Sequence, residues 1–469
     1  MSSGDRFDMV VIGSGPAGEK AAAQGAYFGN RVAIVERSPS PGGAAVSTAG
    51  IPTKTLRETA LYITGFRRRE VYGVSLTLDP DTTVAQLRGR TDQVIQTMTD
   101  AVRRNIERHG IQLVRGEARL GADRTVHVTG DTGEEHILQS NVVLIATGSR
   151  PFHPPGIPFD DPDVYDSETV FEIDRLFSSL VVVGGGAMGC EYASIFTALG
   201  VQVTLVDAGE RLLPFLDREI SELLAETFRG MGMRLMLGSG RAFVERDDRG
   251  LRVRLPSGEE IRPDKVLFAS GRAGNTEGLR LGEAGVKVDE RNRIVVDDTY
   301  RTTAEGIYSA GDVIGPPSLA SVSMEQGRVA ACHALGIPFK KTVDPMPPFG
   351  VYSIPEAAMV GLTEEAAASK GIDYEVGRGW FANNSRATIA GATDGLVKLV
   401  FKRDDRRLLG VHVLGDLATE LVHQGQAALY HGGTIDYFIH VTFNVPTESD
   451  AYKYAAYDGL QRLQARSTT

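Results

Sequence analysis

The feature that most constrains the fold is a glycine-rich turn between two apolar strands near the start of the chain. The segment FDMVVIGSGPAGEKAAAQGAYFGNRVAIVER opens with a continuous apolar run, residues 9–12, typical of a strand covered on both faces. Gly13, Gly15 and Gly18 follow in the spacing G-x-G-x-x-G. Glu36 closes the second strand. In such a unit the glycines let the backbone approach a pyrophosphate, the helix N-terminus stabilises its charge, and the acid binds ribose hydroxyls. The segment therefore predicts a dinucleotide-binding unit.

The same unit recurs later in the chain. SLVVVGGGAMGCEYASIFTALGVQVTLVDAGERLLP carries Gly184, Gly186 and Gly189 in the same spacing. Asp207 follows Gly189 at the interval that separates Glu36 from Gly18. Two chance turns that only start structural helices would not explain an acid at the same place in both units. The repeat therefore predicts that the chain binds two dinucleotides.

Further strands that end in glycine lie outside these two units. Residues 142–145 form an apolar strand before ATGSR, a proline-rich crossing spans residues 151–158, and DKVLFASGRAGNT ends another strand at Gly271. From Pro345 onward, alternating and helical patterns without nucleotide motifs predict an α+β domain. The predicted fold class is α/β, with two Rossmann-like dinucleotide-binding domains and an α+β C-terminal domain.

Composition excludes several classes of function. The chain has 469 residues, of which 42% are hydrophobic and 23% charged, as in soluble globular proteins. No apolar run reaches the roughly 18 residues of a membrane span, so no membrane partner is expected. The net charge of −10 argues against a nucleic-acid partner. The basic cluster at residues 67–69 is expected to be a solvated helix face. The N-terminal segment shows no targeting pattern, which predicts a cytoplasmic protein.

The two cysteines, Cys190 and Cys332, are far apart in sequence, and each lies in an apolar helical segment. Buried, inert thiols are a better interpretation of this placement than a disulfide or a metal site. Cysteine and histidine spacings typical of a metal centre are absent, and no metal is predicted.

The order of these features resembles a known family. Two G-x-G-x-x-G units, ATG, GD and a C-terminal α+β domain are similar to the flavoprotein pyridine nucleotide-disulfide oxidoreductases over essentially the whole chain. Within that family, GCEYASIF, RLLPFLD, GDVIGPPSLAS, EQGRVAA and TFNVPTESDAYKYAAYDGLQRL resemble the soluble, FAD-containing pyridine nucleotide transhydrogenases. The resemblance implies FAD in the first unit, NAD(H) or NADP(H) in the second, and a homodimer formed through the C-terminal domain.

The resemblance also implies the domain boundaries. Residues 1–150 and 274–344 would form an FAD-binding domain, interrupted by an NAD(P)-binding domain at 151–273. Residues 345–469 would form the dimerisation domain.

Site residues follow from the same resemblance, position by position. It implies that FAD contacts Gly13, Gly15, Gly18, Glu36, Gly43, Lys54, Ala146, Thr147, Gly148, Asp312 and Ala320. It implies that the nicotinamide dinucleotide contacts Gly184, Gly186, Gly189, Asp207 and Gly271. Lys54 matches the lysine that lies beside the flavin N5 in this family, and Glu191 matches its glutamate partner. An ammonium there stabilises the charge-rich reduced flavin. The alternative for Lys54 is a surface lysine on the helix after Pro52.

The chain departs from the family where disulfide chemistry takes place. In PGGAAVSTAGIPTK, residues 41–54, Ala45 and Gly50 stand where disulfide reductases carry the redox-active cysteine pair. In NVPTESD, Val445 and Asp450 replace the His and Glu of the thiol-activating couple. Thiol exchange requires thiolates, and neither remaining cysteine lies in this loop. These departures exclude a sulfur relay.

An enzyme with two dinucleotide sites and no relay can move hydride in and out through the same nicotinamide site. This is transhydrogenation, and one shared site predicts ping-pong kinetics. An alternative is an NADH-dependent flavin reductase or diaphorase, because the small side chains at Ala44, Ala45 and Gly50 suggest a cavity for a quinone, oxygen or another small acceptor. A third hypothesis is a non-catalytic flavoprotein scaffold or sensor.

Nucleotide preference can be predicted from the second unit. An acid at Asp207 favours a free ribose 2′-hydroxyl and repels a 2′-phosphate. The positions where NADP-specific relatives carry arginines are Ala208 and Pro214 here, and Arg211 corresponds to a residue common in NAD-using members. We therefore expect tighter binding of NADH than of NADPH.

Overall fold

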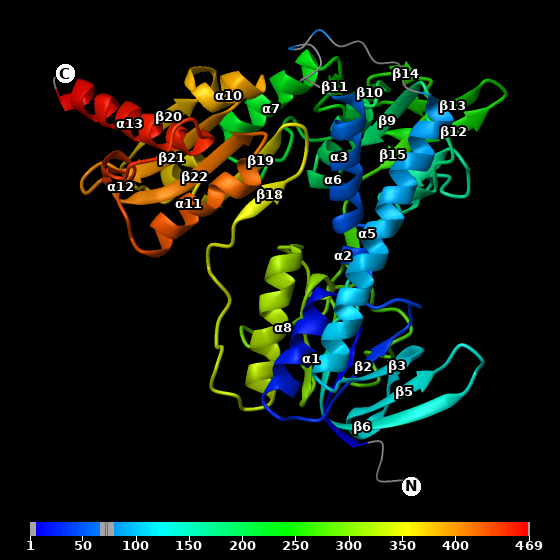
Figure 1. Cartoon of the computed structure of the whole chain (residues 1–469). Coiled ribbons are helices and arrows are strands. Elements are labelled where there is room, and N and C mark those ends of the chain that lie inside the picture. The colour runs from blue at the N-terminus through cyan, green and yellow to red at the C-terminus, as the bar shows by residue number, and fades with distance from the viewer. Residues whose placement is uncertain (1–5, 66–70, 72, 74–78, 468–469) are drawn as a thin grey trace. The chain divides into compact units, whose positions relative to one another are not determined.

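The computed structural model describes residues 6–65, 71, 73 and 79–467 (Figure 1). The chain divides into two compact units. The first unit comprises residues 1–55, 89–152 and 271–345, and the second comprises 56–88, 153–270 and 346–469. The basic cluster at 67–69 lies outside the described residues. No helix among the described residues is long and apolar enough to cross a membrane.

The first unit is built on a mostly parallel sheet with the strand order β3-β2-β1-β6-β5-β4, in which β17 also pairs with β6. Strands β1, β2, β3, β6 and β17 are parallel, and β4 and β5 add an antiparallel edge. The apolar residues of β1 and β2 are buried on both faces, as the continuous runs predict. The strands are β1 Arg6–Ile12, β2 Val32–Glu36, β3 Gln112–Arg115, β4 Glu117–Leu120, β5 Thr125–Thr129, β6 Glu135–Ile145 and β17 Ile307–Ser309.

Two helices cover one face of this sheet. α1 (Pro16–Tyr27) and α8 (Ala320–Ala334) lie side by side (Figure 1). Their small buried residues, among them Ala17, Ala21 and Ala330, join Val11 and Leu144 of the sheet in one apolar cluster. A short antiparallel pair, β7 Ser149–Pro151 with β16 Arg272–Gly274, also belongs to this unit. Three further helices lie in the N-terminal third of the chain: α2 Gly43–Ser47, α3 Ile51–Thr64 and α5 Pro80–Arg108.

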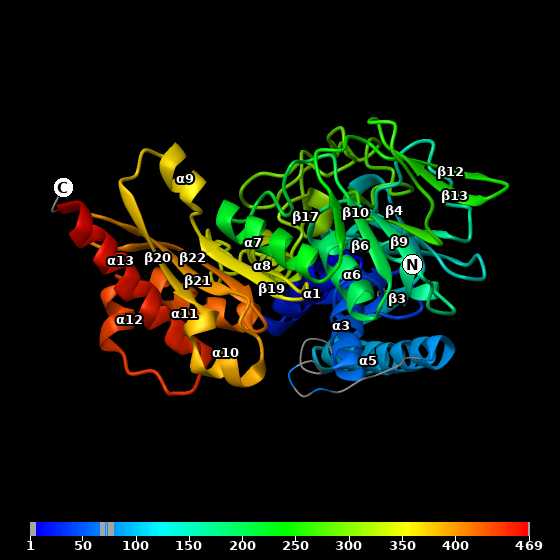
Figure 2. The same cartoon turned by 90° about the horizontal axis from the view of Figure 1, so that it is seen from above.

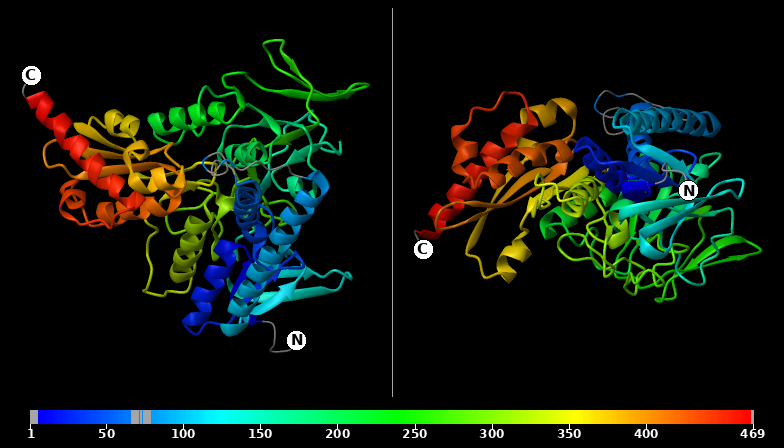
Figure 3. Two further views of the ribbon diagram at one scale, coloured as in Figure 1. Left: turned by 45° about the horizontal axis from the view of Figure 1, so that its top comes forward. Right: turned by 90° about the horizontal axis from the view of Figure 1, so that it is seen from below.

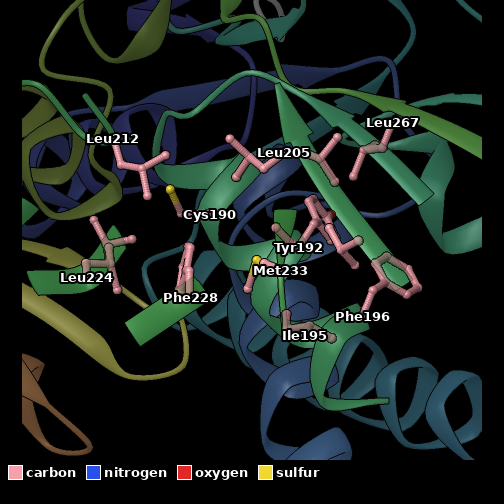
Figure 4. Close-up of a cluster of buried hydrophobic side chains, with 14 of the residues drawn as sticks. Cys190, Tyr192, Ile195, Phe196, Leu205, Leu212, Leu224, Phe228, Met233 and Leu267 are labelled. Carbon is pink, nitrogen blue, oxygen red and sulfur yellow. The ribbon is translucent and has the colours of Figure 1, made fainter. Parts of the chain in front are cut away.

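The second unit contains a five-stranded parallel sheet with the order β11-β10-β9-β15-β8. Its core gathers around α6, where Cys190 lies among Leu205, Leu212 and Phe228 (Figure 4). The elements are β8 Val164–Asp166, β9 Ser179–Val183, α6 Ala187–Ala198, β10 Gln202–Val206, α7 Arg218–Gly230, β11 Arg234–Met236, β12 Phe243–Asp247, β13 Gly250–Arg254, β14 Glu260–Ile261 and β15 Lys265–Phe268. Strands β12, β13 and β14 form a separate antiparallel sheet.

Both cysteines are free and buried, as predicted. Burial raises the pKa of the Cys190 thiol well above its usual range, and the nearby Glu191 carboxylate adds to this effect. A thiol that stays protonated is a poor nucleophile, so Cys190 is chemically inert.

The C-terminal part of the second unit is an antiparallel sheet with the order β18-β19-β22-β21-β20. Helices α11 and α13 pack on this sheet (Figures 2 and 3). Alternate residues of β21 point to opposite faces, so that Val397 and Leu399 join the core under these helices and Lys398 faces away from it. The elements are β18 Phe349–Val351, β19 Glu356–Gly361, α9 Glu364–Ser369, β20 Tyr374–Trp380, α10 Ser385–Ala390, β21 Leu396–Lys402, β22 Leu408–Gly415, α11 Ala418–Tyr430, α12 Asp436–His440 and α13 Ala451–Ser467. The predicted fold class is confirmed.

Candidate functional site

Two of the three glycines in the first turn are required by packing. Gly13 follows β1 with a φ of +100°, and a Cβ on it would clash with the carbonyl oxygen of Ala146. A Cβ on Gly18 would clash with the carbonyl oxygen of Gly13. These positions bring the strand end, the turn and α1 close enough together that only glycine fits.

The second turn repeats this geometry. Gly184 follows β9 with a φ of +118°, and a Cβ on it would lie 2.5 Å from the carbonyl oxygen of Ala269. A Cβ on Gly189 would clash with the carbonyl oxygen of Gly184. Each unit therefore forms the same tight crossing between a strand and a helix.

The middle glycine of each turn has no such packing reason. Gly15 has a φ of −65° and Gly186 a φ of −77°, which any residue can adopt. A Cβ on Gly15 would meet only Gly43 Cα, at 3.9 Å, and one on Gly186 would meet nothing within 4 Å. Both glycines cap a helix without a side-chain hydrogen bond. Open space in front of an uncapped helix N-terminus suits a phosphate, so these residues fit a dinucleotide.

The two predicted acids hold their turns in place. Glu36 accepts hydrogen bonds from Ser14 N at 2.9 Å, from Ser14 Oγ at 2.6 Å and from Ser38 N at 2.7 Å. Asp207 accepts hydrogen bonds from Gly185 N and, at 2.6 Å, from Gly209 N. In each unit the carboxylate is thus bonded to the residue between the first two glycines. The sequence analysis did not identify these contacts, although the residues stand within the quoted motifs.

A second group of predicted FAD residues gathers at the end of β6. Thr147 Oγ1 donates to the carbonyl oxygen of Asn275 at 2.6 Å, and Asn275 Nδ2 donates back to Thr147 O at 3.0 Å. Asp312 accepts from Ser149 Oγ at 3.2 Å and from Ser323 Oγ at 3.1 Å.

The structure thus brings segments 146–149 and 312–323 together. The first contains Ala146, Thr147 and Gly148, and the second contains Asp312 and Ala320. Ser149 and Asn275 lie within the segments ATGSR and DKVLFASGRAGNT but were not predicted as site residues, and Ser323 lies outside every predicted motif.

The loop that carries cysteines in disulfide reductases packs against the first glycine turn. A Cβ on Gly43 would lie 2.8 Å from Gly15 Cα, and Gly42 N donates to Ser14 Oγ at 3.1 Å. Gly43 therefore has to be glycine for the loop to approach this closely. The observation explains the sequence PGGAA without any need for sulfur.

Ala45 and Gly50 lie against each other in this loop. A Cβ on Gly50 would be 2.7 Å from Ala45 O and 3.2 Å from Ala45 Cα. The Ala45 backbone thus fills the space that a side chain at position 50 would take, and the cavity beside Ala44, Ala45 and Gly50 stays a prediction. Within the described residues, Thr48 Oγ1 is buried without a hydrogen-bond partner from the protein. An orphaned hydroxyl beside the turn also fits a bound group.

The predicted pair of Lys54 and Glu191 is divided between the two units. Lys54 lies in the first turn of α3, and its Nζ donates to Thr53 Oγ1 at 3.2 Å. Glu191 is 3% exposed on α6 and accepts a hydrogen bond from Tyr352 N at 3.0 Å. Each is held by its own surroundings, and their pairing stays a prediction.

The C-terminal loop contains an ionisable group that the sequence analysis missed. Val445 is exposed, whereas Glu448, three residues later, is 5% exposed with a buried Oε2 that lacks a hydrogen-bond partner among the described residues. Burial, together with the nearby Asp416 and Glu356 carboxylates, raises the pKa of Glu448 to about 7. The isolated letter E in NVPTESD gives no signal of this burial.

A cluster of three carboxylates lies where the C-terminal sheet meets α7. Asp217, Glu219 and Glu364 are the one group of the described residues whose spacing could hold a metal ion. The buried Lys398 ammonium occupies this position instead, 2.7 Å from Asp217 and 2.9 Å from Glu219, and it also pairs with Glu364. The cluster is therefore a buried ion network.

Comparison with known proteins identifies the family. The family model described as pyridine nucleotide-disulphide oxidoreductase matches residues 7–327, and its dimerisation-domain model matches residues 347–456. The chain belongs to the pyridine nucleotide-disulphide oxidoreductases. This membership confirms the predicted oxidoreductase, with FAD and a nicotinamide nucleotide as its redox groups.

Individual members of the family extend the comparison. The chain is 43% identical over 460 residues to proteins named soluble pyridine nucleotide transhydrogenase from Mycobacterium bovis BCG and Mycobacterium tuberculosis, with 98% of each chain covered. It is 39% identical to the protein of that name from a Marinomonas species, covering 97% of this chain and 99% of the relative. The resemblance to soluble transhydrogenases inferred from the sequence is confirmed.

Solved structures of the pyridine nucleotide-disulphide oxidoreductase fold superpose closely. LpdA from Mycobacterium tuberculosis has a TM-score of 0.88 at 28% identity, covering 97% of this chain and 99% of LpdA. The HOCl-induced flavoprotein disulfide reductase RclA from Escherichia coli has a TM-score of 0.86 at 27% identity, covering 96% and 99%.

Proposed function

We propose that the chain is a soluble NAD(P)+ transhydrogenase, which uses FAD to transfer hydride from one nicotinamide nucleotide to another. The observation that carries the proposal is the combination of two intact dinucleotide cradles with a disulfide-position loop that contains Ala45 and Gly50. The relatives named soluble pyridine nucleotide transhydrogenase, 39–43% identical over nearly the whole chain, support it.

Each group of residues has a task in this proposal. Residues 1–150 and 274–344 would bind FAD, residues 151–273 the nicotinamide nucleotide, and residues 345–469 would join two subunits. When bound, FAD would accept a hydride from one nicotinamide and give it up to another. The open helix starts at Gly15 and Gly186 would hold the two pyrophosphates, while Glu36 and Asp207 would bind ribose hydroxyls.

Lys54 and Glu191 would form the charged pair beside the redox centre. The Lys54 ammonium would stabilise negative charge that develops on the flavin, and Glu191 would keep the lysine protonated and oriented. Burial of Glu191 and its hydrogen bond from Tyr352 N restrict the motion of its carboxylate. Their role is electrostatic, because no proton has to leave Lys54 for hydride to move.

The missing sulfur determines the route of the substrates. Without thiols at Ala45 and Gly50, no relay carries electrons away from the nucleotide site. The oxidised nucleotide must therefore leave before the second one enters, which gives ping-pong kinetics.

Contacts of the second unit support a preference for NADH. Both oxygens of Asp207 accept backbone hydrogen bonds, which hold the carboxylate at the second glycine turn. The Arg211 guanidinium donates to Glu365 Oε1 at 2.9 Å and to Pro214 O at 2.7 Å, so it is already engaged. We expect a lower dissociation constant for NADH than for NADPH in stopped-flow flavin reduction, and equal or tighter NADPH binding would contradict this expectation.

We further infer that the protein acts as a homodimer in the cytoplasm. The match to the family's dimerisation domain supports the dimer, as do exposed aromatic side chains on α11, α12 and α13. Tyrosine side chains are enriched at subunit contacts relative to the rest of a protein surface. The exposed aromatic residues are Tyr430, Tyr437, Tyr454 and Tyr457. Light scattering of the holoenzyme should give the mass of two chains, and a monomer would contradict the inference.

Steady-state kinetics test the proposed reaction. Initial rates of thio-NADP+ reduction by NADH, measured over a matrix of both concentrations, should give parallel double-reciprocal lines. Menadione and glutathione disulfide serve as matched alternative acceptors, and both should be poorer than thio-NADP+. Faster reduction of menadione would favour a diaphorase, and turnover with glutathione disulfide would contradict the absence of a sulfur relay.

A further inference from the structure

One short segment of the C-terminal domain holds the helix that carries Glu191. Residues 352–356 lead into β19, and two of their backbone N–H groups donate to side chains of α6. Tyr352 N donates to Glu191 Oε1 at 3.0 Å, and Ile354 N donates to Ser194 Oγ at 3.0 Å. Glu191 and Ser194 are both buried. The segment is therefore bonded to one face of α6 at two points.

The same segment holds α3 through Arg57. Arg57 is 4% exposed, its Nε donates to Ser353 O at 3.0 Å, and its Nη1 lies 3.3 Å from Glu356 Oε1. Nη1 also donates to the exposed Glu58 at 2.5 Å. A buried guanidinium with a backbone carbonyl and a carboxylate as partners has a fixed direction, because its donors form a rigid planar fork.

Glu356 is in turn held by the next element. It is buried, and its Oε2 accepts hydrogen bonds from Thr419 N at 3.1 Å and from Thr419 Oγ1 at 2.7 Å. Burial raises the pKa of Glu356, whereas Arg57 and Thr419 favour its ionised form. Each oxygen of the carboxylate thus has a partner, so the pair with Arg57 is geometrically defined rather than a loose surface contact.

We propose that Arg57 is a positioning residue for the transhydrogenase reaction, which fixes the rotation of α3 and thereby the direction in which Lys54 projects. Lys54 precedes Arg57 by about one turn of the helix, so the two side chains share a face. A helix anchored at Arg57 cannot turn about its axis without breaking the buried pair with Glu356. The segment that anchors Arg57 also anchors Glu191, the predicted partner of Lys54. The inference rests on the proposed function, because it assigns Lys54 a role beside the flavin.

The test removes the ion pair without leaving a buried charge. Because Arg57→Met alone would strand the Glu356 carboxylate, we choose the double variant Arg57→Met/Glu356→Gln, in which both sites stay uncharged and similar in size. The expected result is at least a tenfold fall in kcat for thio-NADP+ reduction by NADH, with KM for NADH within twofold of wild type. The midpoint potential of the bound flavin should shift to more negative values, since a misdirected ammonium stabilises the reduced flavin less.

Matched variants separate positioning from stability. Arg403→Met/Glu375→Gln removes another ion pair, between two residues of the C-terminal domain that lie 3.4 Å apart. Neither residue belongs to α3, to α6 or to residues 352–356. This control should keep the wild-type kcat and flavin potential. Arg57→Lys keeps the charge opposite Glu356 and should recover part of the lost kcat.

Different results would contradict the role of Arg57 and the proposed transhydrogenase function. A double variant with unchanged kcat and unchanged flavin potential would overturn the role of Arg57. Equal losses in the double variant and in the control would also overturn it, because they would show a general loss of stability. Absence of hydride transfer between nucleotides in the wild-type enzyme would refute the transhydrogenase instead, while the flavin potentials would still decide whether Arg57 directs Lys54.

Discussion

The two glycine turns have the same motif but different surroundings. In the first unit, the loop that contains Gly43 packs directly on Gly15, and Gly42 N is bonded to Ser14. In the second unit a Cβ built on Gly186 would meet none of the described residues within 4 Å. The segment after Asp207 contacts the neighbouring Gly185 instead, through a hydrogen bond from Leu213 N to Gly185 O at 2.9 Å, so the middle glycine is more closely covered in the first turn than in the second.

This difference matches the tasks that the proposed function assigns to the two sites. A covered site suits a cofactor that stays bound through many turnovers. An open site suits a substrate that must leave before its successor enters. In the proposed function, the G-x-G-x-x-G motif would hold a pyrophosphate in both sites, and the closeness of the cover over the middle glycine would distinguish a bound cofactor from an exchanging substrate.

The units also differ in how their ion pairs are buried, and this difference gives the largest expected effect. Lys398 is fully buried and pairs with Asp217, Glu219 and Glu364, whereas in the first unit Arg119 pairs at 3.0 Å with the exposed Glu135. Lys398→Met should lower the free energy of unfolding by about 3–5 kcal/mol, because it leaves uncompensated buried charge. Arg119→Met should cost less than about 1 kcal/mol, because its partner Glu135 stays exposed to water. Chemical denaturation of the two variants measures both, and similar costs would contradict the comparison.

Substitution of the packed glycines, Gly13 and Gly184, should impair the FAD site and the nicotinamide site independently of each other. Gly13→Ala and Gly184→Ala each place a Cβ against a carbonyl oxygen at a positive φ, which should cost about 3 kcal/mol locally. Gly13→Ala should purify without FAD. Gly184→Ala should retain FAD but lose about 100-fold in the rate of flavin reduction by NADH, which corresponds to that energy. The flavin absorbance per chain and stopped-flow reduction are the measurements. Loss of FAD from Gly184→Ala would show that the sites are not independent.

A buried acid of the second unit should make its stability depend on pH. Burial, together with the nearby Asp416 and Glu356 carboxylates, raises the pKa of Glu448 to about 7. An acid whose pKa is raised on folding binds more protons in the folded state, so its contribution to stability is complete below its unfolded pKa of about 4.3 and is lost as the pH rises through about 7.

The unfolding free energy of the wild type should therefore fall by about 2 kcal/mol between about pH 5 and pH 7.5, because folded Glu448 must then ionise. Glu448→Gln cannot ionise and should show a flatter profile. Denaturant titrations at several pH values provide the comparison. Parallel profiles for the two proteins would mean that Glu448 is not the titrating group.

Substitution of the middle glycine of each turn should have the smallest effect on stability, and it should distinguish binding of FAD from binding of NADH. Because Gly15 and Gly186 have ordinary φ values and space for a methyl group, alanine at either position should change stability by less than about 0.5 kcal/mol. If the helix start at Gly186 holds the pyrophosphate as proposed, Gly186→Ala should raise KM for NADH about tenfold, or about 1.4 kcal/mol, because the methyl group would crowd the phosphate. Gly15→Ala should speed the release of FAD and leave KM for NADH unchanged. An unaltered KM for NADH in Gly186→Ala would contradict the proposal that a phosphate of NADH binds at Gly186.

Local patterns in the sequence were sufficient to predict the strands, the glycine turns and the acids at Glu36 and Asp207. These features depend on residues within one strand–turn–helix unit, where periodicity and spacing are visible. The pairs Arg57–Glu356 and Lys398–Asp217 join residues that are distant in sequence, and no one-dimensional pattern reports such contacts. Burial of Glu448 was missed for the same reason.

A single-turnover experiment tests the central claim most directly. The holoenzyme is reduced anaerobically with one equivalent of NADH per FAD, the released NAD+ is removed, and thio-NADP+ is added. The account predicts that the flavin spectrum bleaches with NADH and returns with thio-NADP+, with one thio-NADPH formed for each FAD reoxidised. A flavin that stays reduced with thio-NADP+, yet is reoxidised at once by menadione or oxygen, would contradict it.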